Sequence, residues 1–556
     1  MAESRATDVL VVGAGPVGLT AAVELRRRGV SCRIVDRLVR RLPFAKAVGI
    51  QPRTLEVWDR MGIVREALEA SVPLRGQLAY VNGAPAGRFD LVLPPEVPYR
   101  FAALPQYETE RILTGVLERS GGRIERGTEL VSFGQDASGV TCRLVSAAGM
   151  EEELRVRYLV GCDGAHSAVR KGLGLSFEGG AFPEEYMLGD VEVDWDVPDG
   201  YTVRSSHLGP DGTVDDVLVC IPLPGRKRYR MSMMVPPELS AAQQGGAAGG
   251  SPDGVAHGLE GGAAPGLADI QAVLDRLAPQ PTTASALRWA SVFRISHRIV
   301  DRYGEGRVFV AGDAAHIHPP TGAQGMNTGI QDAWNLAWKL ALAVEGAAGA
   351  GLLASYDAER RPVGEEVVGR TVRHATEGME ADMDDPATLV LREAQLLVGY
   401  RGSPVVGPAG TVGAGGGPRP GDRAPDCGGL TDRIAGYPMR LYDVLRGREH
   451  VLVLYDGGGG ADQGWSDELV DAARESSGGR VEAFAVSGAD GEGGDGTQAG
   501  GTLLPVYRDG RGEFARLYGV ADGVTAFAVR PDGYVGARLA RPGVAELREY
   551  FAGVFG

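Results

Sequence analysis

The sequence predicts an α/β protein in which an antiparallel sheet interrupts a parallel-sheet unit and a second α/β unit follows. Short apolar runs that end in glycine-containing turns recur at 9–12, 158–162 and 308–311, as is typical of buried parallel strands. Between the second and third runs, residues 177–298 show strand patterning, which favours an inserted sheet. Beyond a Gly- and Pro-rich linker at 401–420, strands and helices alternate again, which indicates a further α/β unit.

Bulk properties exclude several classes of function. The chain has 556 residues and a net charge of −15, so we expect several domains and neither a nucleic acid nor an anionic membrane as partner. No apolar span of about 18 residues and no signal-peptide core is present, which argues against membrane insertion and export. The five cysteines are scattered without a CxxC pair, as expected of reduced thiols in a cytoplasmic protein.

A GxGxxG motif at residues 13–18 follows the first strand and opens a helix. In that context Gly13 permits the tight turn, Gly15 lets a pyrophosphate approach the backbone, and Gly18 packs the helix on the strand. The next strand ends at Asp36, where a carboxylate can bond a ribose hydroxyl. The pattern predicts a Rossmann-like dinucleotide site; the alternative is a glycine-rich turn that binds nothing.

A second turn of this type follows the strand at 158–162. Asp163 and Gly164 leave the strand, and Ser167 and Arg170 open a helix, which suggests another cofactor-binding turn. One alternative is that Ser167 only caps the helix. A serine nucleophile is disfavoured because the GxSxG elbow is absent.

The third turn lies within residues 306–340. Asp313 stands at a strand end, a Pro- and Gly-rich loop follows, and a long helix is predicted from about Asn327. Backbone N–H groups at such a helix start can hold an anion or a polarised carbonyl. His316 and His318 form an HxH pair, but no third ligand has suitable spacing, so we expect no metal.

Apolar periodicity and the positions of glycine and proline predict the other helices and strands. We expect a helix over 352–370 that breaks at Pro362, and a largely helical stretch at 382–399. A Gly- and Ala-rich insert at 241–266 is predicted to be a surface loop. Further predictions are helices at 54–61, 106–118, 267–277 and 544–555, strands within 123–145, 187–195, 217–222, 229–235 and 290–298, and strands at 449–455, 481–486, 525–529 and 535–539.

Taken together, GAGPVG, GCDGAHSAVR and AGDAAHIHPPTGAQGMN resemble the motifs of class A single-component FAD-dependent aromatic hydroxylases, over roughly residues 8–375. The tail is similar to the thioredoxin-like domain of the phenol hydroxylase branch, which includes aromatic polyketide hydroxylases. It lacks the redox CxxC, so we expect a structural role, such as homodimerisation. The resemblance implies a para-hydroxybenzoate hydroxylase-like fold with a Rossmann-like FAD-binding domain at 1–176 and 299–400, a middle β-sheet substrate domain at 177–298, a linker at 401–420 and a thioredoxin-like domain at 421–556.

The resemblance also implies where FAD binds. Asp36 would take the adenosine ribose, where the family more often has Glu, and Asp163 would serve both FAD and the reductant. Asp313 would bond the ribityl chain or the pyrophosphate, while Pro319 and Pro320 would line the reacting face of the flavin. The whole expected cofactor-binding set is Gly13, Gly15, Pro16, Gly18, Asp36, Arg37, Lys46, Arg53, Gln106, Arg111, Asp163, Gly312, Asp313, Pro319, Gly322, Gly325, Met326 and Asn327.

The implied reaction is hydroxylation of a small phenolic or polycyclic polyketide substrate. NADPH or NADH would reduce FAD, and dioxygen would then form a flavin C4a-hydroperoxide that delivers one oxygen atom. The sequence names no catalytic base. Candidate substrate-binding residues lie on the predicted middle sheet, although ordinary sheet packing would explain each as well: Tyr229, Met231, Met233, Phe293, Arg294 and His297.

Three other functions stay open at this point. The same scaffold can carry out Baeyer–Villiger or antibiotic-inactivating oxygenation, because the shape of the pocket decides the outcome. A non-catalytic flavin-binding scaffold protein is disfavoured by the intact Gly-Asp loop at 312–313. A dehydrogenase that uses NAD alone is disfavoured because the chain has both the DG and the GD turns.

Overall fold

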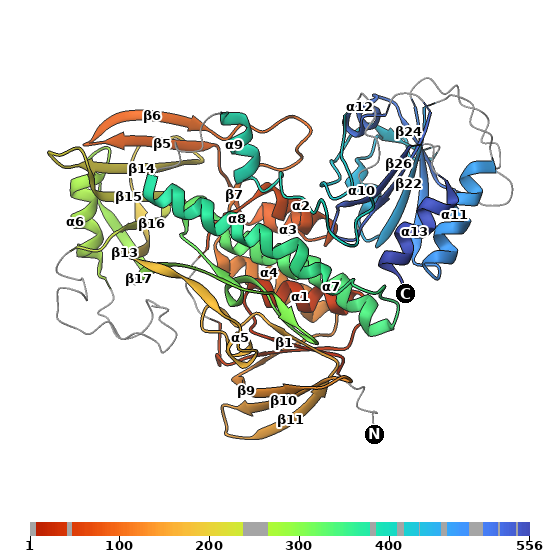
Figure 1. Cartoon of the computed structure of the whole chain (residues 1–556). Coiled ribbons are helices and arrows are strands. Elements are labelled where there is room, and N and C mark those ends of the chain that lie inside the picture. The colour runs from red at the N-terminus through yellow and green to blue at the C-terminus, as the bar shows by residue number, and fades with distance from the viewer. Residues whose placement is uncertain are drawn as a thin grey trace.

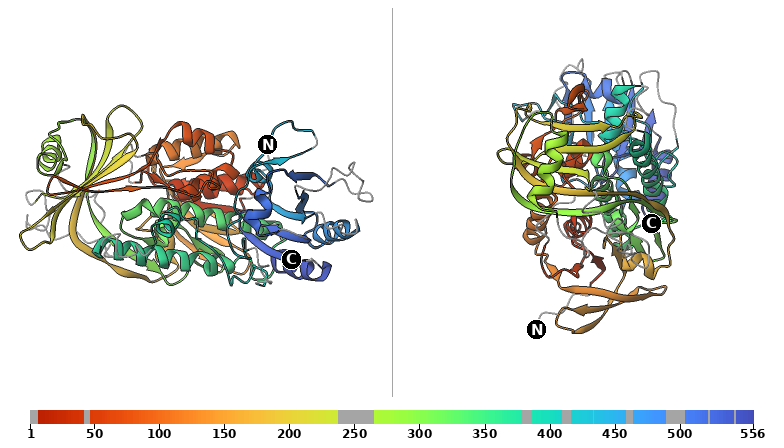
Figure 2. Two further views of the ribbon diagram at one scale, coloured as in Figure 1. Left: turned by 90° about the horizontal axis from the view of Figure 1, so that it is seen from above. Right: turned by 90° about the vertical axis from the view of Figure 1, so that its left-hand side faces the viewer.

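The structure is a computed structural model that describes residues 7–41, 47–236, 265–377, 385–408, 416–432, 434–457, 464–488, 504–520, 523–540 and 543–556. Figure 1 shows a parallel sheet with its helices in the centre, a second sheet on the left and a C-terminal unit on the right. Seen from above, the same three parts follow one another along the length of the molecule (Figure 2). Among the described residues, no helix is long and apolar enough to cross a membrane.

The central sheet has six strands in the order β18-β19-β12-β1-β2-β8, and all neighbouring pairs except β18–β19 are parallel. Its middle strands are apolar and buried on both faces, as expected of a parallel sheet between helices. The three predicted apolar strands and Asp36 at the end of the next strand are confirmed. The elements are β1 (Val9–Val12), β2 (Cys32–Asp36), β8 (Ile124–Arg126), β12 (Tyr158–Gly161), β18 (Gly304–Glu305), β19 (Val308–Val310), α1 (Pro16–Arg27), α4 (Gln106–Arg119), α5 (Ala168–Gly172) and α7 (Gly325–Glu345).

The strand order brings the three motif-bearing turns together. Strands β19, β12 and β1 are neighbours and parallel, so their carboxyl ends leave the same edge of the sheet. Backbone hydrogen bonds tie these ends to one another: the Cys162 amide donates to the Val12 carbonyl at 2.7 Å, and the Ala311 amide donates to the Gly161 carbonyl at 3.0 Å. Motifs about 150 residues apart in sequence therefore form one site.

The middle sheet has eight strands in the order β20-β17-β13-β16-β15-β14-β5-β6, antiparallel except between β14 and β5. The predicted antiparallel insert is present and its first strand begins at Phe177, but the middle sheet also includes β5 and β6 from the first segment of the chain. β5 joins the sheet by pairing with β14, a strand that the sequence did not predict, and β6 pairs with β5. The strands are β5 (Gly76–Val81), β6 (Ala84–Asp90), β13 (Phe177–Val193), β14 (Tyr201–Leu208), β15 (Val214–Pro222), β16 (Arg228–Met234), β17 (Ala284–Val300) and β20 (His316–Ile317), and α6 (Leu267–Leu277) packs on one face.

Two helical predictions need correction. Helix α8 (Ser355–Glu377) runs through Pro362 without a break, because buried partners of Glu359 and Arg360 hold this part of the helix in place. Helix α9 (Pro386–Glu393) is shorter than predicted. Most of the 241–266 insert lies outside the described residues. The other small elements are α2 (Pro52–Arg60), α3 (Val64–Glu69), β3 (Gly49–Ile50), β4 (Val72–Pro73), β7 (Ala102–Ala103), β9 (Thr128–Gln135), β10 (Val140–Ser146) and β11 (Glu151–Val156).

The C-terminal unit has its own six-stranded sheet, in the order β21-β24-β23-β22-β25-β26. The four predicted strands and the final helix are confirmed, whereas β21, β24 and the helices α10 to α12 were not predicted. The described ends of the 401–420 linker are packed rather than loose: the Gly407 amide donates to the Gly536 carbonyl at 2.8 Å. The elements are β21 (Leu430–Thr431), β22 (His450–Asp456), β23 (Val481–Ser487), β24 (Val506–Asp509), β25 (Val524–Val529), β26 (Val535–Ala540), α10 (Leu441–Leu445), α11 (Gly464–Ser476), α12 (Glu513–Tyr518) and α13 (Val544–Val554).

Candidate functional site

The first turn has the close packing that its glycines predict. Gly13 has φ +98°, and a Cβ there would lie 2.3 Å from the Cys162 carbonyl oxygen. A Cβ at Gly18 would lie 1.9 Å from the Gly13 carbonyl oxygen. At Gly15, by contrast, a Cβ would meet nothing within 4 Å. The turn is therefore tight against the neighbouring strand and open at the position where a pyrophosphate would approach.

The start of α1 suits a negatively charged ligand. Its N-cap residue Gly15 offers no side-chain acceptor, Pro16 occupies the first helical position, and the first turn carries no acidic residue. The first N–H groups of a helix lack intrahelical partners and carry a partial positive charge. A diphosphate can satisfy them, so this turn fits the cofactor that the motif predicts.

Asp36 lies at the end of β2 beside this turn. Its Oδ2 accepts from the Ala14 amide at 2.8 Å, and its Oδ1 accepts from the Leu38 amide at 2.8 Å. Arg126 approaches to 3.4 Å, while Arg37 is exposed. A carboxylate has about four acceptor positions, so Asp36 can orient the turn and still accept from a ribose hydroxyl.

The second turn is held by its own side chains. Asp163 accepts from the Ser167 hydroxyl at 2.6 Å and from the Ala168 amide at 2.7 Å, and burial raises its pKa. The Ser167 hydroxyl oxygen in turn accepts from the Arg170 amide at 2.9 Å, so Ser167 caps α5. Arg170 donates to the Ala314 carbonyl at 3.2 Å and thereby links the second turn to the third.

Asp332 on α7 organises the third turn, although the sequence did not single it out. It is fully buried and accepts from the Gly312 amide at 3.1 Å and from Arg360 at 2.8 Å. It also shares a 2.8 Å hydrogen bond with His316 Nε2. Burial alone would raise the pKa of Asp332, but Arg360 and His316 hold it below its usual value. The HxH pair thus has a structural partner, and His316 stacks on His318 with ring centroids 6.4 Å apart.

The loop before α7 is fixed by amide side chains. The Gln51 side-chain amide donates to the Gly322 carbonyl at 2.5 Å, and the Gln51 backbone amide donates to Asn327 Oδ1 at 2.9 Å. Asn327 Nδ2 donates to the Gly49 carbonyl at 2.9 Å and to the Ala323 carbonyl at 2.7 Å. The Asn327 side chain is therefore used within the protein, whereas α7 starts without a side-chain cap. Its first backbone amides remain suited to an electron-rich ligand edge.

The other predicted cofactor residues lie around this loop with mixed exposure. Pro319 is buried, and Asp313 and Pro320 are exposed. Gln106 accepts from the Ala47 amide at 3.3 Å, which places it on the loop side. The remaining positions are Arg111, which is exposed and paired with Glu108 at 2.7 Å, Gly325, which begins α7, Met326, which packs against the core, and Lys46, which lies outside the described residues.

Arg53 differs from its prediction. Its side chain is 2% exposed and donates to Glu56 at 2.8 Å and to the Asp532 carbonyl at 2.9 Å. Its guanidinium also lies 4.7 Å from the centre of the Tyr534 ring. These contacts direct Arg53 toward the C-terminal unit and do not support its assignment to the cofactor. Asp532 and Tyr534 lie about 480 residues from Arg53 in the sequence, so no local pattern could have signalled these contacts.

Four of the six predicted substrate residues lie on the covered face of the middle sheet. Met231 and Met233 are fully buried in the core beneath α6, so their assignment to a substrate pocket is corrected. Tyr229 packs against the same core, with its ring 5.1 Å from that of Trp195. Arg294 belongs to this face by strand alternation and pairs with Glu185 at 3.1 Å.

Phe293 and His297 lie on the opposite face, which we call the uncovered face. Tyr186 pairs with Phe293 across the strands, with ring centroids 6.0 Å apart. Val219 and Ile221 share this face by register, and Ile221 packs against the core around Val48 and Ala103, next to the loop fixed by Gln51. The strict alternation of β16 and β17 would have separated the two faces, but nothing in the sequence said which one α6 covers.

A buried polar group interrupts the apolar uncovered face. Arg230 donates to Asp190 at 2.5 Å, and the Trp289 indole donates to the other oxygen of Asp190 at 2.9 Å. The Arg230 guanidinium lies 4.8 Å from the centre of the Trp289 ring. Arg230 and Asp190 are each about 2% exposed or less, so this pair fixes the positions of three strands from within the sheet.

Comparisons with known proteins show the family of this chain. A family model described as an FAD binding domain matches residues 6–371. A flavin-dependent monooxygenase of Mycobacteroides abscessus is 35% identical over 458 residues, which is 80% of this chain and 88% of that protein. The 6-methylpretetramide 4-monooxygenase of Streptomyces rimosus is 38% identical over 373 residues, which is 66% of this chain and 62% of that protein.

The whole fold also matches a solved structure. A ternary complex of aklavinone-11 hydroxylase with FAD and aklavinone superposes with a TM-score of 0.74 at 27% identity, and the match covers 99% of each chain. The correspondence thus includes the C-terminal unit as well as the region matched by the family model. The likeness extends from the glycine turn to the last helix.

Proposed function

The chain belongs to the family of FAD-dependent aromatic monooxygenases, and from this premise we propose that it hydroxylates a phenolic or polycyclic polyketide substrate against the uncovered face of the middle sheet. Its reaction uses NAD(P)H and dioxygen besides FAD. The single observation that carries the proposal is the contrast between the two faces. One face is sealed by α6, whereas the other carries the half-exposed side chains of Tyr186, Phe293, Val219 and Ile221. Ile221 lies next to the loop before α7, residues 318–324, which we call the flavin loop.

Bound FAD supplies the redox chemistry, since it takes a hydride from NAD(P)H and, once reduced, activates dioxygen. The protein residues would position FAD and shield it from water. The open start of α1 would bind the diphosphate, and Asp36 would accept from the ribose. The first amides of α7 would face the pyrimidine edge of the flavin, where negative charge develops on reduction. Pro319 and the loop fixed by Gln51 would keep water from the reacting face.

The substrate class follows from the side chains of the uncovered face. Tyr186 and Phe293 offer aromatic surfaces, and Val219 and Ile221 extend the same apolar face. Aromatic side chains favour offset or edge contacts with another ring system. Two relatives are named for 6-methylpretetramide and aklavinone, which supports a ligand of that kind here. Baeyer–Villiger insertion on the same ligand class would use the same face and remains the second candidate.

The C-terminal unit is proposed to be thioredoxin-like and without redox activity. The order β23-β22-β25-β26, with β22–β23 parallel and the other two pairs antiparallel, supports the fold, and its one cysteine, Cys427, is buried. A homodimer through this unit is also proposed, because Ile434 and Tyr437 on its surface are 96% and 66% exposed. A cytoplasmic location is supported by the five unpaired cysteines.

The proposal is tested with the FAD-loaded enzyme under labelled dioxygen. NAD(P)H consumption and product masses are recorded for a panel of phenols and polycyclic quinones. We expect one compound to accelerate consumption and to gain one labelled oxygen atom, and fragmentation then separates ring hydroxylation from ester insertion. Stoichiometric hydrogen peroxide without any oxygenated product across a broad panel would contradict the proposal.

Two adjacent residues provide a matched pair for the location of the substrate. Phe293 lies on the uncovered face and Arg294 on the covered face. We expect Phe293→Ala to raise the substrate KM about tenfold, equivalent to about 1.4 kcal/mol of lost contact. Arg294→Ala should leave the substrate KM within about twofold. Equal effects of the two substitutions would show that the face is assigned wrongly.

A further inference from the structure

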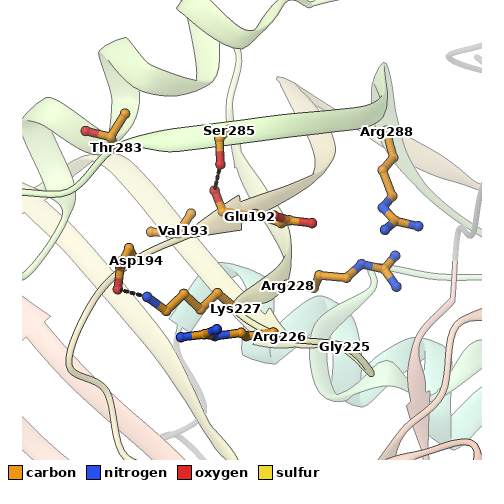
Figure 3. A pocket seen from close by; sticks show the side chains of 10 residues that line it. All are labelled: Glu192, Val193, Asp194, Gly225, Arg226, Lys227, Arg228, Thr283, Ser285 and Arg288. Atoms are coloured by element: carbon orange, nitrogen blue, oxygen red, sulfur yellow. Dashed lines mark hydrogen bonds and ion pairs between the residues drawn. The ribbon is translucent and has the colours of Figure 1, made fainter.

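A basic pocket of about 410 Å³ lies at one end of the middle sheet, where β13, β16 and β17 meet the turn before β16. Figure 3 shows its lining side chains. Four of them are basic, namely Arg226, Lys227, Arg228 and Arg288, and two are acidic. A local excess of positive charge in a chain of net charge −15 favours a negatively charged ligand.

The pairing of these side chains leaves the arginines available. Asp194 neutralises Lys227. Arg228 donates to the Pro224 carbonyl at 2.9 Å and to the Tyr107 hydroxyl at 3.3 Å, both of which are neutral. Within the described parts of the chain, Arg226 and Arg288 have no hydrogen bond or ion pair of their own. Figure 3 shows the guanidinium groups of Arg228 and Arg288 turned toward one another.

Two guanidinium groups that share a pocket repel each other unless an anion lies between them. Glu192 lines the same pocket, but no ion pair joins its carboxylate to either arginine. The planar fork of arginine matches the oxygens of a phosphate in a bidentate manner. The two guanidinium groups thus form a site that a phosphate group of a ligand could neutralise.

The position of the pocket connects it to the cofactor site. Arg228 contacts Tyr107 at the start of α4, the next residue after Gln106, whose side chain accepts from the Ala47 amide. Arg41 donates to the Tyr107 carbonyl at 2.9 Å. Through Tyr107 and Gln106 the pocket therefore borders the segment at Ala47 and Val48. Val48 belongs to the small core against which Ile221 of the uncovered face packs.

The reaction of the family needs a nicotinamide nucleotide, and among the described residues a GxGxxG motif between a strand and a helix occurs once, at residues 13–18, where it is assigned to FAD. We propose that this basic pocket binds the phosphate groups of NAD(P)H while its nicotinamide reaches toward the flavin loop. The proposal rests on the monooxygenase function stated above. An anionic aromatic substrate would offer the same charge chemistry, so the test separates the two sources.

The test uses the FAD-loaded enzyme and the double variant Arg226→Ala/Arg288→Ala. Both side chains are exposed, so the fold and the FAD content should not change. NADP⁺ and adenosine 2′,5′-bisphosphate are titrated by calorimetry, and the KM for NADPH is measured separately. We expect both dissociation constants and the KM for NADPH to rise about tenfold or more, and to become less dependent on salt.

The matched control is Arg65→Ala/Arg119→Ala, which removes the same charge from exposed positions outside the pocket. It should change NADP⁺ binding by no more than about twofold. If the pocket variant binds NADP⁺ like the control and instead raises the KM of the aromatic substrate, the pocket serves the substrate and the proposal is overturned. If neither ligand is affected, it is overturned as well. The proposed oxygenation would survive both results, because labelled-oxygen transfer tests it separately.

Discussion

The two halves of α7 carry two buried ionic networks: the first fixes the third turn, and the second fixes the C-terminal unit. In the first half, Asp332 gathers a backbone amide, a histidine and Arg360 around the third turn. In the second half, Asn335 and Lys339 contact Glu359 of α8, which also binds Arg530 of the C-terminal unit. One helix thus fixes the flavin loop at one end and a whole domain at the other (Figure 1).

The second network contains more charge than the first. Glu359 accepts from Arg530 at 2.7 and 2.8 Å, from Lys339 at 2.7 Å and from Ser403 at 2.6 Å. Asp532 binds the same Arg530 at 2.5 Å. Burial would raise the pKa of Glu359, but Arg530 and Lys339 lower it below its usual range. The third turn is held by a backbone amide as well as by charged side chains. The C-terminal unit is held mainly by the buried cations Arg530 and Lys339, which are neutralised by carboxylates.

The largest expected effect is at Glu359. Glu359→Gln leaves Arg530 and Lys339 buried without their shared carboxylate, so the free energy of unfolding should fall by about 3–5 kcal/mol. Urea unfolding followed by circular dichroism measures this loss. The control is Glu365→Gln, whose half-exposed side chain pairs with Arg361; it should change stability by less than about 0.5 kcal/mol. Equal stability of the two variants would show that the domain does not depend on this network.

The next effect tests the first half of α7. Asp332→Asn should raise the dissociation constant of FAD about tenfold, because the Gly312 amide and His316 lose a charged acceptor. The loss of stability should be smaller than at Glu359, because Arg360 still donates to the Tyr400 hydroxyl and the Thr328 carbonyl. Titration of the apoprotein with FAD, followed by flavin fluorescence, gives the constant. Glu359→Gln is the counterpart and should bind FAD within about threefold of the wild type. Weaker FAD binding in Glu359→Gln than in Asp332→Asn would contradict the assignment of the third turn to the first network.

A third test uses one histidine from each region whose pKa is lowered by its surroundings. Burial and the nearby His316 lower the pKa of His318 to about 4, and burial lowers the pKa of His450 in β22 to about 3. In the unfolded chain a histidine has a pKa of about 6.5. Between this pKa and the lower pKa of the native state, the unfolded chain therefore binds more protons than the native state. Stability therefore rises with pH across this window and is lost as the pH falls from about 6.5 toward 4.

His450→Leu should flatten that pH dependence for the C-terminal unit, and His318→Leu should flatten it for the FAD-binding part. The measurement is the urea midpoint at pH 5 and pH 7, read from probes in each region. Val92, which is 72% exposed and does not titrate, is the control position, and Val92→Ala should keep the wild-type slope. Unchanged slopes in both histidine variants would mean that neither histidine is kept neutral by the fold.

The smallest expected effect concerns backbone strain in the flavin loop. Ala323 has φ +54° between Gly322 and Gln324, a conformation that costs an alanine about 1 kcal/mol relative to glycine. Ala323→Gly should therefore raise the melting temperature slightly and tighten FAD binding by less than about threefold. Ala286→Gly relieves the same strain, φ +48°, in the middle sheet and should leave FAD binding unchanged. Weaker FAD binding in Ala323→Gly alone would mean that the methyl group is needed against Gly49.

Local sequence was sufficient for the elements that carry their own signals. The three turns, Asp36 at a strand end and the helices at 106–119 and 267–277 follow from glycine positions and apolar spacing, which act over a few residues. Ser167 shows the limit of such reading: the sequence allowed a helix cap and a cofactor turn, and the hydrogen bond from the Arg170 amide shows the cap without deciding whether the turn also contacts a cofactor.

Three glycine-bearing turns after buried strands, and their order, could be predicted from local patterns, because each is a short-range set of backbone constraints. Long-range packing was needed to place α6 over Met231 and Met233, β5 beside β14, and Asp332 against the third turn. Arg53 is the clearest case, since its partner Asp532 lies 479 residues away. Strand alternation defines two faces but not which one is buried, and a charged residue signals that a partner is needed without saying where the fold will supply it.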